Sequence, residues 1–123
     1  MNTHEVIRKR LLDRAGLSEP PKCAGDMRQL MESEWSPAFE RHMRARLVMG
    51  ALRYGTLEHK RRSGHKWDLL GAVSRKLERY KQTGNTELLV DAANYLLLEF
   101  EVGKHPGKHF SATDDKDHCK VMR

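Results

Sequence analysis

The fold is decided by the stretch Leu88-Leu89-Val90-Asp91-Ala92-Ala93-Asn94-Tyr95-Leu96-Leu97-Leu98-Glu99-Phe100. Apolar residues recur in it at the three- and four-residue spacing of an α-helix, and Asn85 or Thr86 before it is a suitable N-cap. Gly103 follows as a stop signal. The sequence therefore predicts a helix from Thr86 to Val102, with Leu96 in the core.

A second apolar stripe precedes this helix. It spans residues 67–82 and places Trp67, Leu70, Val73 and Leu77 at helical spacing. Because the loop from Gln82 to Thr86 is short, the two helices are expected to form an antiparallel αα-hairpin. We expect this hairpin to pack on a third helix over residues 37–54, which Ser36-Pro37 begins and Gly55 ends.

Glycine and proline divide the rest of the chain into further helix-sized pieces. One helix is predicted from Thr3, as its N-cap, to Arg14 or Ala15, and a short one from Asp26 to Glu34. Residues 56–66 are expected to be a polar, basic connection.

Strand patterns are nearly absent, so the predicted class is all-α: a small helical bundle of four to five helices with a polar C-terminal tail. The expected organisation is an N-terminal helix and linker (1–36), a helical core domain (37–103) and the tail (104–123).

Composition excludes several classes of protein. The chain has 123 residues, of which 38% are apolar and 33% charged, as expected of one domain with a single core. No apolar run approaches the ~18 residues of a membrane span, and the first residues do not resemble a signal peptide. The two cysteines, Cys23 and Cys119, are expected to be reduced. We therefore expect a soluble cytoplasmic protein with no membrane partner.

Positive charge is concentrated in one segment. From Arg41 to Lys66, eight Lys and Arg residues accompany one acidic residue, Glu58, so the segment's net charge of +7 exceeds the +6 of the whole chain. Such a field favours an anionic partner: a nucleotide, a nucleic acid or an acidic protein. A merely solvated basic face is an equally open interpretation. The sequence lacks the common nucleic-acid-binding motifs and a glycine-rich phosphate loop.

Three polar residues share one stripe of the last predicted helix. Glu87, Asp91 and Asn94 are spaced at i, i+4 and i+7, so they project from nearly the same side. Asp91 and Asn94 also interrupt a run in which core packing would supply apolar residues. Carboxylate and amide oxygens suit Mg²⁺, so Asp91 and Glu87 are candidate metal ligands. Hydrogen bonds to neighbouring groups are the alternative interpretation.

Two basic residues of the preceding helix extend this candidate site. Lys76 and Arg79 lie one turn apart, and the hairpin is expected to bring them to Asp91 and Asn94. The four residues would form the polar end of a pocket, either as ion pairs or as a phosphate clamp.

The loop from Gly103 to Phe110 carries His105 and His109. Pro106 and Gly107 between them disfavour a helical zinc pair. The loop is expected either to close over the neighbouring pocket, with both histidines bonding a phosphate, or to be a solvated tail.

Several separate stretches of the chain together resemble a known family. They are Arg53-Tyr54-Gly55, Trp67, Lys76-Leu77-Glu78-Arg79-Tyr80, Thr83-Gly84-Asn85, Leu89-Val90-Asp91-Ala92-Ala93-Asn94-Tyr95, His105-Pro106, His109-Phe110 and Thr113-Asp114. This pattern, from Met43 to Asp114, resembles small phage-borne proteins grouped with MazG-like and nucleotide-modification-associated proteins.

The resemblance implies an all-α nucleoside triphosphate pyrophosphohydrolase, a homodimer or homotetramer, in the cytoplasm of a bacterial host. In that family, Glu-x-x-Glu and Glu-x-x-Asp motifs on successive helices hold Mg²⁺ around the phosphates. The second motif falls on Asp91-x-x-Asn94. The first falls near Ser74 to Glu78, where this chain has Lys76-x-x-Arg79 and one carboxylate.

The roles that follow are catalytic for Asp91, Glu87 and Glu78, with Mg²⁺ on Asp91 and Glu87. Substrate binding falls to Lys76, Arg79, Asn94, His105 and His109. Because the acidic ligands are fewer than in the family, binding of a nucleotide without cleavage is an open alternative. A basic-face protein that binds nucleic acid or an acidic protein through residues 41–66 is the other.

Overall fold

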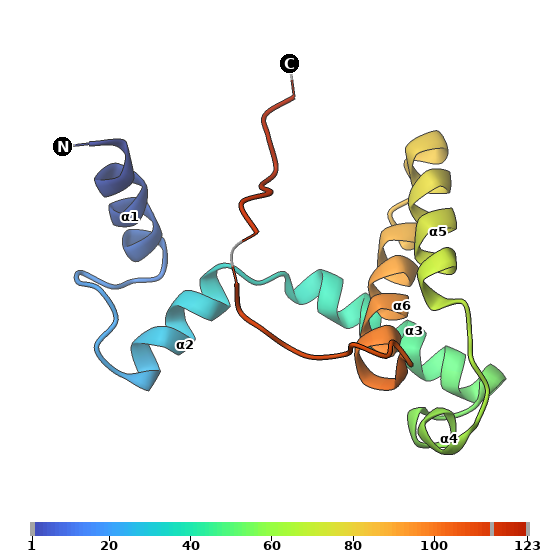
Figure 1. Cartoon of the computed structure of the whole chain (residues 1–123). Coiled ribbons are helices and arrows are strands. Elements are labelled where there is room, and N and C mark those ends of the chain that lie inside the picture. The colour runs from blue at the N-terminus through green and yellow to red at the C-terminus, as the bar shows by residue number, and fades with distance from the viewer. Residues whose placement is uncertain (1, 114, 123) are drawn as a thin grey trace. The chain divides into compact units, whose positions relative to one another are not determined.

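A computed structural model describes residues 2–113 and 115–122 of the chain (Figure 1). Its helices are α1 (Thr3–Arg14), α2 (Ala24–Ser33), α3 (Pro37–Tyr54), α4 (Leu57–Arg62), α5 (Leu69–Thr83) and α6 (Glu87–Val102). No strand forms among the described residues, so the predicted all-α class is confirmed.

The first helix begins one residue earlier than predicted, because of its capping groups. Asn2, rather than Thr3, is the N-cap of α1. Its side-chain oxygen accepts from the Glu5 N–H at 2.9 Å, and the Glu5 carboxylate accepts from the Asn2 N–H at 3.2 Å. This reciprocal pair of bonds satisfies two of the donors that every helix N-terminus leaves open.

The helix that the sequence interpretation misses is α4. It lies inside the expected basic connection, and the Thr56 hydroxyl caps it by accepting from the His59 N–H at 3.1 Å. Six residues with a single apolar member carry no apolar periodicity, so only the cap could have indicated this helix. The described residues therefore hold six helices rather than four to five.

The chain forms two compact units, residues 1–45 and 46–123, and the boundary lies inside α3. In the first unit, α1 and α2 contact each other, and Arg14 Nε lies 3.6 Å from Glu34 Oε2. Neither helix contains a buried residue. The first unit is therefore held by caps and partly exposed contacts rather than by a core.

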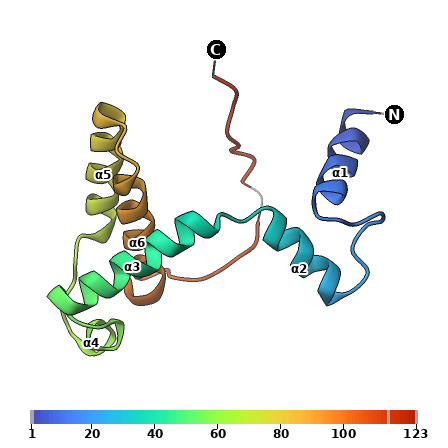
Figure 2. The same ribbon diagram turned by 180° about the vertical axis from the view of Figure 1, so that it is seen from behind.

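The second unit is built on the hairpin of α5 and α6, which lie side by side in both views (Figures 1 and 2). Gly84 ends α5 with φ of +71°, a conformation that favours glycine, and its N–H donates to the Tyr80 carbonyl at 2.8 Å. This turn reverses the chain, so the predicted hairpin is confirmed. Among the described residues, the buried apolar side chains all lie on it: Leu69, Val73, Leu88, Val90, Ala92 and Val102.

One packing prediction for this hairpin is wrong. Leu96 is 50% exposed rather than in the core, and Phe100 is 66% exposed. The part of α3 that belongs to the same unit, residues 46–54, contains no buried residue, although Leu47 and Ala51 are half-buried. Because α6 is apolar on nearly every side, its periodicity could not tell which face meets α5.

Two further properties bear on the class of protein. Among the described residues, no helix is long and apolar enough to cross a membrane. Cys23 and Cys119 are exposed free thiols.

Candidate functional site

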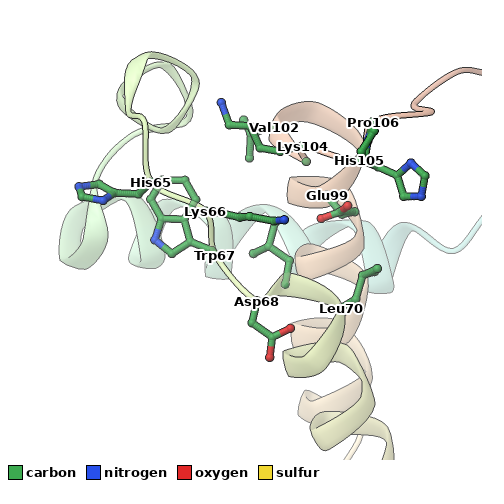
Figure 3. Close-up of a pocket in the computed structure, with 12 residues that line it drawn as sticks. His65, Lys66, Trp67, Asp68, Leu70, Glu99, Val102, Lys104, His105 and Pro106 are labelled. Carbon is green, nitrogen blue, oxygen red and sulfur yellow. The ribbon is translucent and has the colours of Figure 1, made fainter.

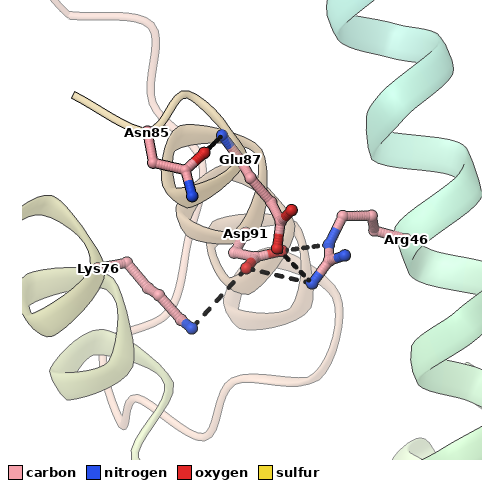
Figure 4. Close-up of polar contacts among 5 residues, drawn as sticks. All are labelled: Arg46, Lys76, Asn85, Glu87 and Asp91. Carbon is pink, nitrogen blue, oxygen red and sulfur yellow. Dashed lines mark hydrogen bonds and ion pairs between the residues drawn. The ribbon is translucent and has the colours of Figure 1, made fainter. Parts of the chain in front are cut away.

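Four charged residues of the second unit form a cluster beside the hairpin (Figure 4): Arg46, Lys76, Glu87 and Asp91, hereafter the ion-pair cluster. Arg46 Nε donates to Asp91 Oδ1 at 2.6 Å, and its Nη2 reaches Asp91 Oδ2 at 3.4 Å. Arg46 Nη2 also lies 3.3 Å from Glu87 Oε1, and Lys76 Nζ lies 3.7 Å from Asp91 Oδ2. Both oxygens of Asp91 are therefore engaged by cations.

Burial strengthens this cluster around Asp91. The Asp91 side chain is 13% exposed, whereas those of Lys76 and Arg46 are 25% and 36% exposed. The hydrogen bond to Asp91 raises the pKa of the Arg46 guanidinium; burial opposes this, and the charges of Asp91 and Glu87 add to it. The cluster contains two positive and two negative side chains, so its net charge is zero.

The residues present do not fit the magnesium site that the resemblance implies. A carboxylate must offer its oxygens to the ion, but those of Asp91 already bind a guanidinium and face an ammonium group. Nowhere among the described residues do three His, Cys, Asp or Glu side chains gather in a metal-binding arrangement. The carboxylates of Asp91 and Glu87 instead neutralise Arg46 and Lys76.

Glu78 and Arg79 are not brought to this cluster. Glu78 is exposed and pairs with Lys81 at 3.7 Å. Arg79 is exposed, and its guanidinium makes no ion pair within the described part of the chain. Asn94 is buried in α6 at 8% exposure. Of the predicted four-residue constellation, the structure brings together Lys76 and Asp91.

His105 and His109 lie elsewhere, beyond the far end of α6. Val102 is eleven positions after Asp91 along α6, which is about 16 Å at 1.5 Å per residue. The loop that begins at Gly103 therefore does not close over the ion-pair cluster. It borders a different cavity.

That cavity, hereafter the open-end pocket, lies where α5 begins and α6 ends (Figure 3). Its volume is about 400 Å³, within the range of small-molecule sites. The segment before α5 supplies His65, Lys66, Trp67 and Asp68, and the end of α6 with the following loop supplies Glu99, Val102, Lys104 and His105. Residues separated by more than thirty positions thus line one site.

Local hydrogen bonds fix the α5 side of this pocket. Asp68 caps α5 by accepting from the Gly71 N–H at 3.0 Å, and its other oxygen lies 3.4 Å from Arg75. The Trp67 ring lies 6.1 Å from that of His65 at a tilt of 60° and remains 38% exposed. The cap therefore anchors a segment that presents an indole surface to the cavity.

The α6 side is fixed by a close turn. Gly103 follows α6, and a side chain at this position would collide with the backbone and carboxylate of Glu99. His105 Nδ1 accepts from the Gly107 N–H at 2.9 Å, which in the neutral ring leaves the proton on Nε2. His105 can thus donate outward from Nε2.

The charges of the open-end pocket contrast with those of the ion-pair cluster. Among the described residues, the ammonium groups of Lys66 and Lys104 and the carboxylate of Glu99 form no ion pair. Asp68 is offset by Arg75. The unpaired charges therefore sum to a net positive value in a concave site beside an aromatic ring.

Sequence reasoning missed Arg46, Lys66 and Lys104. In the sequence, Arg46 belongs to the basic segment 41–66, although its position three residues after Met43 places it close to the apolar stripe of α3. Lys66 and Lys104 each neighbour a residue that was noticed, Trp67 and His105. Their proximity depends on how the two ends of the hairpin meet, which no local pattern encodes.

Comparison of the chain with protein-family models, curated proteins and solved structures gave no match in any of the three.

Proposed function

We propose that the protein binds a nucleotide, or another phosphate-bearing heterocycle, in the open-end pocket and without a metal ion. The observation that carries this proposal is the presence of two unpaired ammonium groups beside an exposed indole in a cavity of about 400 Å³. An aromatic ring offers a surface on which a base can stack, and cations with an outward imidazole N–H can hold phosphate oxygens.

The sequence resemblance supports the same ligand class. Trp67 and His105-Pro106, two of the separate stretches that resemble MazG-like phage proteins, line this one pocket. A nucleotide is also the ligand of that family. We propose a phage-type nucleotide-binding protein of the cytoplasm on these two grounds.

Binding rather than hydrolysis is proposed because of the chemistry of Asp91. Magnesium-dependent cleavage requires free carboxylate oxygens around the metal, whereas both oxygens of Asp91 and one oxygen of Glu87 are paired with Arg46 or Lys76. The pocket itself offers one unpaired carboxylate, Glu99. A sequestering or sensing role fits these groups better than pyrophosphate hydrolysis.

Binding of nucleic acid or an acidic protein through the basic segment has less support. Arg44, Arg46, Arg61 and Arg62 are paired with Glu40, Asp91, Glu101 and Glu58 respectively. Four of the segment's eight basic residues are thus neutralised by a nearby carboxylate. A homo-oligomer remains a proposal, supported by exposed apolar residues such as Leu96 and Phe100.

Fluorescence titration tests the proposed function directly. The chain has two tryptophans, Trp35 and Trp67, so a Trp35→Phe variant reports on the pocket alone. We expect AMP or ATP to quench this signal equally in Mg²⁺ and in EDTA. Lys66→Ala and Lys104→Ala should each weaken binding roughly tenfold, since a charge-assisted bond is lost.

Lys81→Ala is the matched control, because Lys81 is on α5 but pairs with Glu78 outside the pocket. It should leave the affinity unchanged. Absence of quenching by any nucleotide would refute the proposal, as would equal losses in the pocket variants and the control.

A further inference from the structure

A second cavity adjoins the open-end pocket and shares two wall residues with it. It has a volume of about 350 Å³ and is lined by Glu99, Phe100, His105, Lys108, His109 and Phe110. Glu99 and His105 line both cavities. The two spaces are therefore neighbouring compartments of one surface, each in the size range of a small-ligand site.

Each compartment has its own aromatic surface. Trp67 serves the first, while Phe100 and Phe110, 66% and 83% exposed, serve the second. The ring contact between His65 and Trp67 is the one found among the described residues, so neither phenyl ring is stacked on another ring. Exposed, unstacked rings at a concave site can each accept a base by stacking.

Each compartment is lined by at least one lysine, and a histidine belongs to both. Lys104 lines the first and Lys108 the second, and His105 belongs to both. Lys108 Nζ donates to the Gly103 carbonyl at 3.3 Å, which holds its charge close to the end of α6. An anionic group that joined two bases would meet these cations.

The loop between the compartments is ordered by its own hydrogen bonds. The Lys108 N–H donates to the His105 carbonyl at 3.1 Å, and the Gly107 N–H donates to His105 Nδ1. The His109 ring nitrogen Nδ1 lies 2.8 Å from the Gly107 carbonyl, which can only accept, so Nδ1 carries the proton. The neutral rings consequently differ: His105 offers an Nε2–H donor, and His109 an Nε2 acceptor.

From this juxtaposition we propose that the ligand has two bases joined through phosphate, one base on Trp67 and the other against Phe100 and Phe110. This inference deepens the proposed function and rests on it. The phosphodiester lies at Lys104, His105 and Lys108, and the carboxylate of Glu99 accepts from a sugar hydroxyl or a base amino group. A single nucleotide would leave the second aromatic surface unused.

Affinities for AMP and for 5′-phosphorylated diadenylate test the proposal. We expect the dinucleotide to bind the unmodified protein roughly 10-fold or more tightly than AMP, since stacking a second base contributes on the order of 5- to 100-fold. Phe110→Ala should remove most of this advantage and leave the AMP affinity unchanged. Trp67→Ala should weaken both ligands.

The design separates the two proposals. If AMP binds and diadenylate binds no more tightly, the two-base inference is overturned while the proposed function stands. A Phe110→Ala variant that keeps the full advantage also overturns the inference. If neither ligand binds, the proposed function fails first. Because Phe110 is 83% exposed, its removal should leave the helical circular dichroism signal intact.

The same chemistry could come from a free dinucleotide or from a single strand, and two further probes distinguish these sources. Cyclic diadenylate tests a closed dinucleotide. An adenylate decamer offers about nine overlapping dinucleotides, so affinity above that statistical factor indicates a strand as the source. In either case the affinity must depend on both Trp67 and Phe110; independence from Phe110 would count against the two-base ligand.

Discussion

The two ends of the α5–α6 hairpin treat charge in opposite ways. Around the start of α6, the four residues of the ion-pair cluster neutralise one another, and Asp91 is nearly buried. At the other end, Lys66, Lys104 and Glu99 line a cavity, and none of them forms an ion pair with another described residue. The sequence draws attention to Asp91 and Lys76 of the first group and to none of the second, and the geometry gives the two groups different roles.

The contrast shows how to separate a structural polar cluster from a binding site. A carboxylate and a cation that pair with each other have few free hydrogen-bonding positions for a ligand. Removing one of them leaves the other as an unpaired, partly buried charge. Charges that form no ion pair, such as those of Lys66 and Lys104 within the described part of the chain, remain available to a ligand. Asp68 illustrates the intermediate case, since it lines the cavity but is committed to capping α5.

The largest predicted difference between the two ends concerns packing. Leu88, beside the ion-pair cluster, is 6% exposed, whereas Leu70, which lines the open-end pocket, is 53% exposed. Leu88→Ala should lower the free energy of unfolding by about 2–5 kcal/mol, and Leu70→Ala by less than about 1 kcal/mol. Chemical denaturation measures both. Equal losses would show that the open end is as tightly packed as the other.

The next prediction concerns Asp91. Asp91→Ala removes the anion shared by Arg46 and Lys76, so unfolding should become easier by about 2 kcal/mol. The figure is below that for a fully buried pair because both cations are partly exposed and regain water. Nucleotide affinity of the folded variant should not change.

Glu78→Ala is the matched control for this change. Glu78 pairs with Lys81 on the exposed side of α5, so its loss should alter stability by less than about 0.5 kcal/mol. If Asp91→Ala abolished nucleotide binding at undiminished stability, Asp91 would belong to the binding site and the contrast between the two ends would be broken.

Most of the helical framework could be predicted because its signals are local. Apolar spacing and breakers such as Gly84 located α5 and α6 to within two residues, and Ser36-Pro37 located the start of α3. The weak signal of α4 was a single threonine cap. The exposure of Leu96 could not be predicted, because a helix that is apolar on most sides does not reveal which side finds a partner.

The candidate site was less predictable, for a reason that concerns distance in the sequence. Lys76 was expected to meet Asp91 because a short loop joins their helices. Arg46 is 45 residues from Asp91 and reaches it through the placement of α3, which no spacing rule indicates. The open-end pocket likewise requires residues 65–68 and residues 99–106 to meet, so its parts were noticed singly and not as a site.

The smallest predicted effect is that of magnesium on the unligated protein. If the cations of Arg46 and Lys76 occupy the place that a metal would take, Mg²⁺ does not bind the folded protein and does not stabilise it. The midpoint of thermal unfolding should then differ by less than about 1 °C between Mg²⁺ and EDTA. The shift caused by AMP should likewise be equal in the two buffers. A midpoint raised by several degrees in Mg²⁺, and lowered again by Asp91→Asn, would mean that the metal displaces Arg46 from the carboxylate. In that event the cluster would be a metal site that Arg46 occupies in the absence of the metal, and both ends of the hairpin would be binding sites.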